Sequence, residues 1–168
     1  MHHLKRFCIP RSTQRPRGQG YMWIMLNHFL VGCGWVEIAV THTATSEATI
    51  EGLHHIFATH GVPDTLVSDN GSCFTSEQFA NFCNRNSITH ITSAPFHPAS
   101  NGLAERAVQT FKAKLKQMKS GSLTTKIARI LLRQHITPHS TTGLPPCQLL
   151  MGRVIKTPLG AVFPSVHA

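Results

Sequence analysis

Two carboxylates in the middle of the chain, Asp69 and Glu105, are the residues whose type and setting could do chemistry. Asp69 comes directly after a short, mostly apolar segment (65–68), and Glu105 lies in a segment with helical periodicity. Carboxylate oxygens are ligands that Mg²⁺ prefers. Two Mg²⁺ ions about 3.5–4 Å apart stabilise both the attacking and the leaving oxygen of a phosphodiester. A strand-end Asp and a helix-borne Glu converge on such a site if the helix packs across the sheet.

The segments around this pair alternate between strand and helix patterns. Thr45-Ser46 and Thr75-Ser76 are typical N-caps, and apolar residues at helical spacing follow each of them. We predict strands over 21–31, 35–41, 65–67 and 88–92, a loop over 93–100, and helices after each cap, over about 102–119 and over 124–135. This order indicates an α/β fold. Asp69 then ends a strand of an open sheet, where ligands commonly bind.

The helix that carries Glu105 has two different faces. An apolar face is expected to pack on the core, and it consists of Leu103, Ala107, Phe111, Leu115 and Met118. A polar stripe holds Glu105, Gln109, Lys112 and Lys116. Taken alone, this stripe is better explained as a solvated polar face, which is the default for an amphipathic helix.

The composition indicates one domain with a polyanionic partner. The chain has 168 residues, 16 Lys and Arg against 7 Asp and Glu, and a net charge of +9, which favours nucleic acid over a small-molecule substrate. Five positive charges lie in the first 17 residues, and residues 1–20 are expected to form an irregular basic leader. The five cysteines form no CxxC pair, which favours reduced thiols. No apolar stretch is long enough to span a membrane.

Two blocks of sequence around the carboxylates resemble the integrases of retroviruses and Gypsy-type long-terminal-repeat retrotransposons. The first block is residues 61–76, which include Val67-Ser68-Asp69-Asn70-Gly71, and the second is residues 93–112, which include His97-Pro98-Ala99-Ser100-Asn101-Gly102. Thirty-five residues separate Asp69 from Glu105, as in the Asp, Asp-35-Glu signature of that family. Residues 137–146 and 149–153 look like the segment that closes the same core. The resemblance extends over residues 35–166 and is strongest over 35–153.

This resemblance implies an RNase H-like fold, in which a mixed central sheet is flanked by helices, with a core-like domain over residues 21–166. It implies DNA integration by strand transfer, with Mg²⁺ or Mn²⁺ as cofactor. Asp69 and Glu105 are implied as catalytic residues and metal ligands, and the residues implied to contact DNA are Asn70, Asn101, Lys112 and Lys116. It also implies DNA as partner, a nuclear location and a homo-oligomer.

The front of the chain departs from the family pattern. The family carries its first catalytic Asp on the first strand, but residues 1–63 contain no Asp. Residues 8–17 do not have the pattern of a strand, so we expect the first strand to be missing or diverged. The paired His/Cys spacing of the family's zinc module is not found either. We therefore expect an integrase core with impaired catalysis, a pseudoenzyme of transposable-element origin.

Two other readings stay open. The first is a non-catalytic, basic nucleic-acid-binding module, motivated by the net charge. The second is an intact enzyme whose metal site is completed by another subunit or by an unexpected ligand such as Asn27 or His28. Asn is a weak neutral ligand and His suits softer metals, so the impaired core is preferred.

Overall fold

The computed structural model describes residues 6–9, 21–27, 34–92, 98–140 and 142–157, and within it side chains are described for residues 34–92, 108–140 and 142–157. Five strands form one sheet in the order β3-β2-β1-β4-β5. The strands are β1 (Arg6–Ile9), β2 (Tyr21–Asn27), β3 (Val36–Thr41), β4 (Thr65–Ser68) and β5 (Thr89–Thr92). β1 pairs antiparallel with β2 and parallel with β4, so the sheet is mixed.

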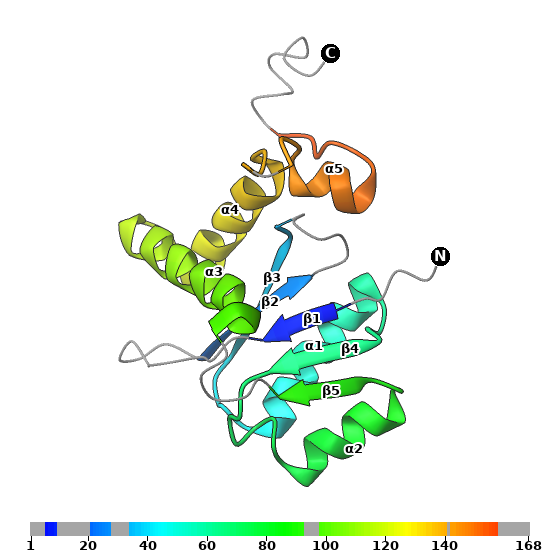
Figure 1. Ribbon diagram of the computed structural model, residues 1–168. Coiled ribbons are helices and arrows are strands. Elements are labelled where there is room, and N and C mark those ends of the chain that lie inside the picture. Colours follow the sequence, from blue (N-terminus) through cyan, green and yellow to red (C-terminus); the bar gives the residue numbers. More distant parts are fainter. Residues whose placement is uncertain (1–5, 10–20, 28–33, 93–97, 141, 158–168) are drawn as a thin grey trace.

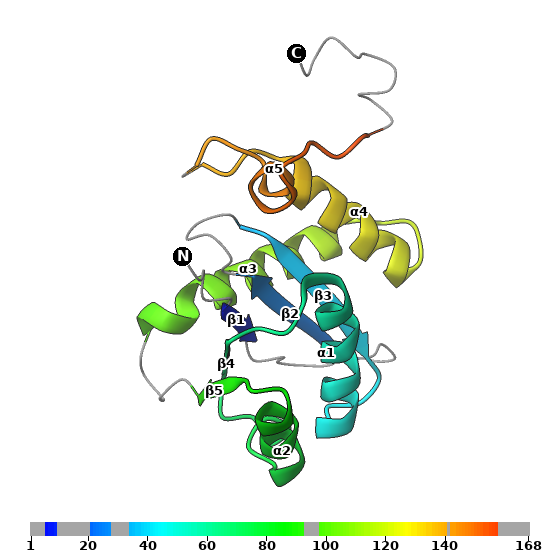
Figure 2. The same cartoon turned by 90° about the vertical axis from the view of Figure 1, so that its right-hand side faces the viewer.

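Five helices accompany these strands: α1 (Ser46–His60), α2 (Glu77–Arg85), α3 (Pro98–Gln117), α4 (Leu123–Ile136) and α5 (Pro146–Met151). Figures 1 and 2 show α3 and α4 on one face of the sheet and α1 on the other. Between α1, α2 and the sheet lies a core that includes Leu53, Leu66 and Phe79. A second core, which includes Val36, Phe111 and Ile130, lies under α3 and α4. No described helix is both long enough and apolar enough to cross a bilayer.

The predicted caps and periodicities of the first two helices are confirmed. The Thr45 side chain accepts a hydrogen bond from the backbone N–H of Ala48, and the Ser76 hydroxyl accepts one from that of Phe79. Gly61 ends α1 at φ 78°, a value that glycine adopts without strain. Each cap fixes where its helix begins, and therefore how long a turn connects it to the preceding strand.

The strand expected to be missing or diverged is present. Residues 6–9 form β1, in the centre of the sheet, although they were predicted to belong to an irregular leader. Residues 8 and 9 belong to this strand, although the segment 8–17 was judged not to have the pattern of a strand. Backbone hydrogen bonds to a partner on each side hold a short strand in place without the apolar alternation that makes a strand recognisable in a sequence.

The largest other differences from the prediction concern two helices. α3 begins at Pro98, four residues before the predicted start at Gly102, and proline suits a first helical turn because its missing N–H has no partner there. The predicted loop over 93–100 therefore ends by residue 97. The short helix α5 was not predicted, although Pro146 at its start and Gly152 in the left-handed region at its end are its signals.

Candidate functional site

Asp69 lies in the turn that directly follows β4, as predicted. Its Oδ1 accepts a hydrogen bond of 2.8 Å from the backbone N–H of Gly71. A Cβ added to Gly71 would lie 2.9 Å from that same oxygen, which is too close, so glycine allows the backbone to approach the carboxylate. The turn therefore fixes one oxygen of Asp69 through main-chain geometry.

The second carboxylate oxygen of Asp69, Oδ2, differs from Oδ1 in its hydrogen bonding. Oδ2 is buried and has no hydrogen-bond partner among the described residues. Leaving a buried polar atom without a partner typically costs about 1–3 kcal/mol. The Cys73 thiol lies nearby, and its pKa is raised by burial and by the negative charge of Asp69. A buried carboxylate oxygen without a donor is suited to a bound cation.

Ser68 and His90 support the same strand end from the other side, and neither was singled out from the sequence. The Ser68 hydroxyl is fully buried and donates to the backbone carbonyl of Asp69 at 2.9 Å. His90 Nε2 lies 2.8 Å from the same hydroxyl oxygen and must be the donor, because the single hydroxyl hydrogen is already used. Burial lowers the pKa of His90. This bridge ties the end of β4 to β5.

The strand beside Asp69 has no carboxylate. In β1, Ile9 pairs with Ser68 and Cys8 pairs with Val67, and the strand sequence is Arg-Phe-Cys-Ile. Successive strand positions alternate between the two faces of a sheet. Val67 packs on the core under α3 and α4, so position 8, which pairs with it, falls on the α3 face of the sheet. Asn27, considered above as a substitute ligand, pairs with Phe7 instead of with the end of β1.

Helix α3 carries the remaining predicted residues. It contacts β1 and β2, and Figure 1 shows its first turns beside the arrowhead of β1. Glu105 and Asn101 belong to these first turns, and their side chains lie outside the described part of the structure. Lys112 is half-buried, whereas Lys116 and, at the Asp69 turn, Asn70 are exposed. The backbone thus brings the Glu105 helix to the strand that lies next to β4.

The described side chains supply only part of a magnesium site. Among them, no three His, Cys, Asp or Glu residues lie close enough to hold a metal ion together. Asp69 fits one ligand position, because its Oδ2 is buried without a donor. A site for two Mg²⁺ ions needs further carboxylates, and β1 contributes none. The side chains that the structure describes therefore do not form a complete two-metal centre.

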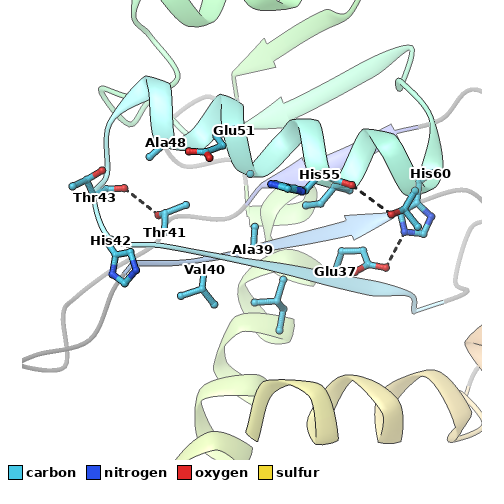
Figure 3. Close-up of a pocket in the computed structure, with 14 residues that line it drawn as sticks. Glu37, Ala39, Val40, Thr41, His42, Thr43, Ala48, Glu51, His55 and His60 are labelled. Carbon is cyan, nitrogen blue, oxygen red and sulfur yellow. Dashed lines mark hydrogen bonds and ion pairs between the residues drawn. The ribbon is translucent and has the colours of Figure 1, made fainter. Parts of the chain in front are cut away.

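A separate groove of about 690 Å³ lies between the edge strand β3 and helix α1, and it was not predicted. Figure 3 shows its lining, where the Glu37 carboxylate meets His60. Glu37 Oε1 lies 2.8 Å from His60 Nε2 and accepts a hydrogen bond of 2.9 Å from the Trp35 indole. Burial opposes ionisation of Glu37, but these hydrogen bonds outweigh it and lower its pKa. None of the predicted site residues whose side chains are described lines this groove.

On the other side of Trp35, the ring of His135 stacks with a centroid distance of 3.6 Å. His135 Nε2 lies 2.9 Å from the carbonyl oxygen of Val36, and burial lowers the pKa of His135. The cluster joins the start of β3 to the ends of α1 and α4. Its contacts are satisfied within the protein, which is typical of a structural polar network.

Comparisons with known proteins agree with this architecture. The model of the integrase core domain family matches residues 31–98, which include Asp69. An uncharacterised protein of Caenorhabditis elegans is 38% identical over 134 residues, 78% of this chain and 11% of that protein. The Pro-Pol polyprotein of feline foamy virus is 32% identical over 157 residues, 88% of this chain and 13% of the polyprotein.

Among solved structures, the catalytic core domain of HTLV-2 integrase in complex with magnesium, in a trimeric form, has a TM-score of 0.72. It is 20% identical and covers 88% of this chain, and this chain covers 96% of it. The likeness establishes an RNase H-like fold. The chain belongs to the integrase core family of retroviruses and retroelements. It spans little more than a tenth of the length of the two curated relatives.

Proposed function

We propose that this chain is the core domain of an integrase that acts on DNA at the end of β4, and that its strand-transfer activity is impaired. One observation carries the proposal: β1, the strand beside the Asp69 strand, keeps its place in the sheet but supplies no carboxylate. In this proposal Asp69 and Glu105 are the two remaining ligands, and Asn70, Asn101, Lys112 and Lys116 are the residues near DNA.

Magnesium is the cofactor in this proposal, with Mn²⁺ as the more permissive substitute. A related HTLV-2 core binds magnesium, and the buried, unpartnered Oδ2 of Asp69 supports a cation nearby. One missing carboxylate removes a unit of negative charge and a hard ligand, so we expect Mg²⁺ to bind weakly. The chain's own contribution is then to hold Asp69 in place through Gly71, Ser68 and His90.

A second candidate function is non-catalytic binding of nucleic acid. The net charge of +9 favours it, because phosphate neutralisation by Lys and Arg supplies affinity without any catalytic group. Both candidates share DNA as partner, assembly with further copies of the chain, and a nuclear location. They differ only in whether the protein retains any strand-transfer activity.

Strand-transfer and nicking assays with purified protein, in Mg²⁺ and in Mn²⁺, distinguish these candidates. Glu105→Gln is the matched control, because it removes the carboxylate and keeps the size of the side chain. We expect a folded protein that binds DNA and gives no product above the control. Product that disappears in Glu105→Gln would refute the impairment, and a folded protein that fails to bind DNA at low salt would refute both candidates.

A further inference from the structure

The chain contains two Asn-Gly dipeptides, and the structure places them in different settings. Asn70-Gly71 lies in the turn after β4, where Asn70 is exposed. Asn101-Gly102 lies inside α3, which begins at Pro98. Asparagine is a thermolabile residue, and its amide is most vulnerable before glycine, which lets the next backbone nitrogen approach closely. The same dipeptide can therefore react differently at its two positions.

Deamidation of asparagine requires a close approach of two atoms. The backbone nitrogen of the following residue attacks the side-chain Cγ, the new N–Cγ bond closes a cyclic imide, and the Cγ–Nδ2 bond breaks. The attacking nitrogen gives up its proton, which leaves with the amide group as ammonia. Water then opens the imide at either carbonyl and yields aspartate or isoaspartate. Holding the reacting atoms close together accelerates an intramolecular step of this kind.

The turn after β4 meets these requirements at Asn70. The Gly71 N–H donates to Asp69 Oδ1 at 2.8 Å, within the distance at which a carboxylate can take up a proton from its donor. Gly71 has no Cβ, so no side chain on this residue obstructs its nitrogen. The Gly71 carbonyl accepts hydrogen bonds of 2.9 and 3.1 Å from the N–H groups of Phe74 and Thr75, which hold Gly71 in place. The attacking nitrogen is thus unhindered, oriented and beside a proton acceptor.

The second dipeptide is held by helix α3. In a helix, the N–H of Gly102 points along the axis towards the carbonyl four residues earlier. Its nitrogen can turn towards the preceding residue only when this part of α3 opens, and such local opening costs free energy. The helix therefore protects Asn101, although the dipeptide sequence is the same.

We infer that Asn70 is a site of spontaneous deamidation, in which Gly71 supplies the attacking nitrogen and Asp69 Oδ1 takes up its proton and passes it to the departing amide. Water is the co-reactant that opens the imide. The inference depends neither on DNA nor on a bound metal, because every protein group in it belongs to the turn after β4.

The modification changes the surroundings of Asp69. Isoaspartate carries the main chain through the former side chain, which adds a methylene carbon between Asp69 and Gly71. The Gly71 N–H is then displaced from Asp69 Oδ1, which it contacts in the unmodified turn. Oδ2 already has no hydrogen-bond partner among the described residues. Deamidation of Asn70 therefore releases the carboxylate that the turn had fixed.

The test follows both dipeptides in one sample. The folded full chain is incubated in mildly alkaline buffer at 37 °C, and peptide mapping by mass spectrometry measures asparagine, aspartate and isoaspartate at positions 70 and 101. A parallel sample in concentrated urea lacks both the turn and the helix. Asn70→Gln is the matched variant, because it keeps the amide but requires a larger ring. A thermal melt confirms that each variant is folded.

In the folded chain, we expect Asn70 to deamidate at least about tenfold faster than Asn101, because Asn101 reacts only when α3 opens. In urea the two rates should agree within about threefold, since both dipeptides then lie in unfolded chain. Asn70→Gln should stay unmodified at position 70. Equal rates at the two positions of the folded chain, or an Asn70 that the fold protects as strongly as Asn101, would overturn the inference.

Asp69→Asn tests the carboxylate as proton acceptor, because its amide oxygen still accepts from the Gly71 N–H but is a far weaker base. We expect position 70 to deamidate at least about threefold more slowly in this variant, a small part of the effect of about 10²–10⁴-fold that positioned bases reach in enzymes. An unchanged or higher rate would refute the role of Asp69. Hydrogen exchange at the Gly71 amide should be faster in the isoaspartate form, and unchanged protection there would contradict the release of Asp69.

Discussion

β4 and β1 are neighbours in the sheet, but only β4 is followed by a carboxylate. β4 has a buried Leu66, a bridged Ser68 and a carboxylate at its end, all held by specific contacts. β1 has four residues that pair with β4, and none of the four is acidic. Sheet pairing depends on backbone hydrogen bonds, which nearly any residue supplies, whereas a metal site depends on one side-chain type at one position. A strand can therefore take its place in the sheet without supplying a metal ligand.

The largest effect is expected from removing the centre of β4. Leu66 is fully buried in the core that α1 and α2 cover, so Leu66→Ala should lower the free energy of unfolding by about 2–5 kcal/mol. Urea denaturation measures this loss. Thr89→Ala, at an exposed position on β5, is the control and should change stability by less than about 0.5 kcal/mol. A loss below 1 kcal/mol for Leu66→Ala would mean that β4 is not the anchored strand.

A smaller effect of opposite sign is expected at Asp69. Asp69→Asn keeps an oxygen that can accept from the Gly71 N–H, and it replaces the buried, unpartnered and charged oxygen Oδ2 by a neutral amide nitrogen. Stability should rise by about 1 kcal/mol in metal-free buffer. Manganese should raise the Tm of wild type more than that of Asp69→Asn. An equal rise of Tm with manganese in wild type and in Asp69→Asn would contradict a role of Oδ2 in binding a cation.

The smallest effect is expected from pH. Burial lowers the pKa of both His90 and His135 below the ordinary 6.5, so as pH falls below about 6.5 the unfolded chain binds protons that the folded chain does not. The Tm should therefore decline between pH 7 and pH 5.5. The Glu37 pKa is lowered from 4.5, so its contribution is present above about pH 4.5 and is lost only as pH falls through the lower folded value.

The control for the pH prediction is His90→Gln/His135→Gln. Glutamine can donate to the Ser68 hydroxyl and to the Val36 carbonyl, the partners of these two imidazoles, and it does not titrate. The Tm of this variant should depend less on pH between 7 and 5.5. An unchanged slope would assign the acid sensitivity to other groups.

The regions that the sequence predicts well are those with local signals. The caps at Thr45 and Ser76, the apolar spacing of α1 and α2, and the strand ending before Asp69 all act within a few residues. β1 has no such signal, because it is held by neighbours that lie far away in the chain. The Ser68–His90 bridge escaped notice for the same reason, since it joins residues that are 22 positions apart. Likewise, the groove beside β3 is formed by the packing of α1 against β3, and no local sequence pattern predicts it.

The central claim is that one missing carboxylate on β1 separates this protein from an active integrase core. Its most direct test is strand transfer in Mn²⁺ by Cys8→Asp, with Cys8→Asn as control, because position 8 pairs with Val67 on the face that α3 covers. We predict no product from wild type or Cys8→Asn, and product from Cys8→Asp that Glu105→Gln abolishes. Wild-type product that depends on Glu105 would contradict the claim, because the site would then be complete without β1.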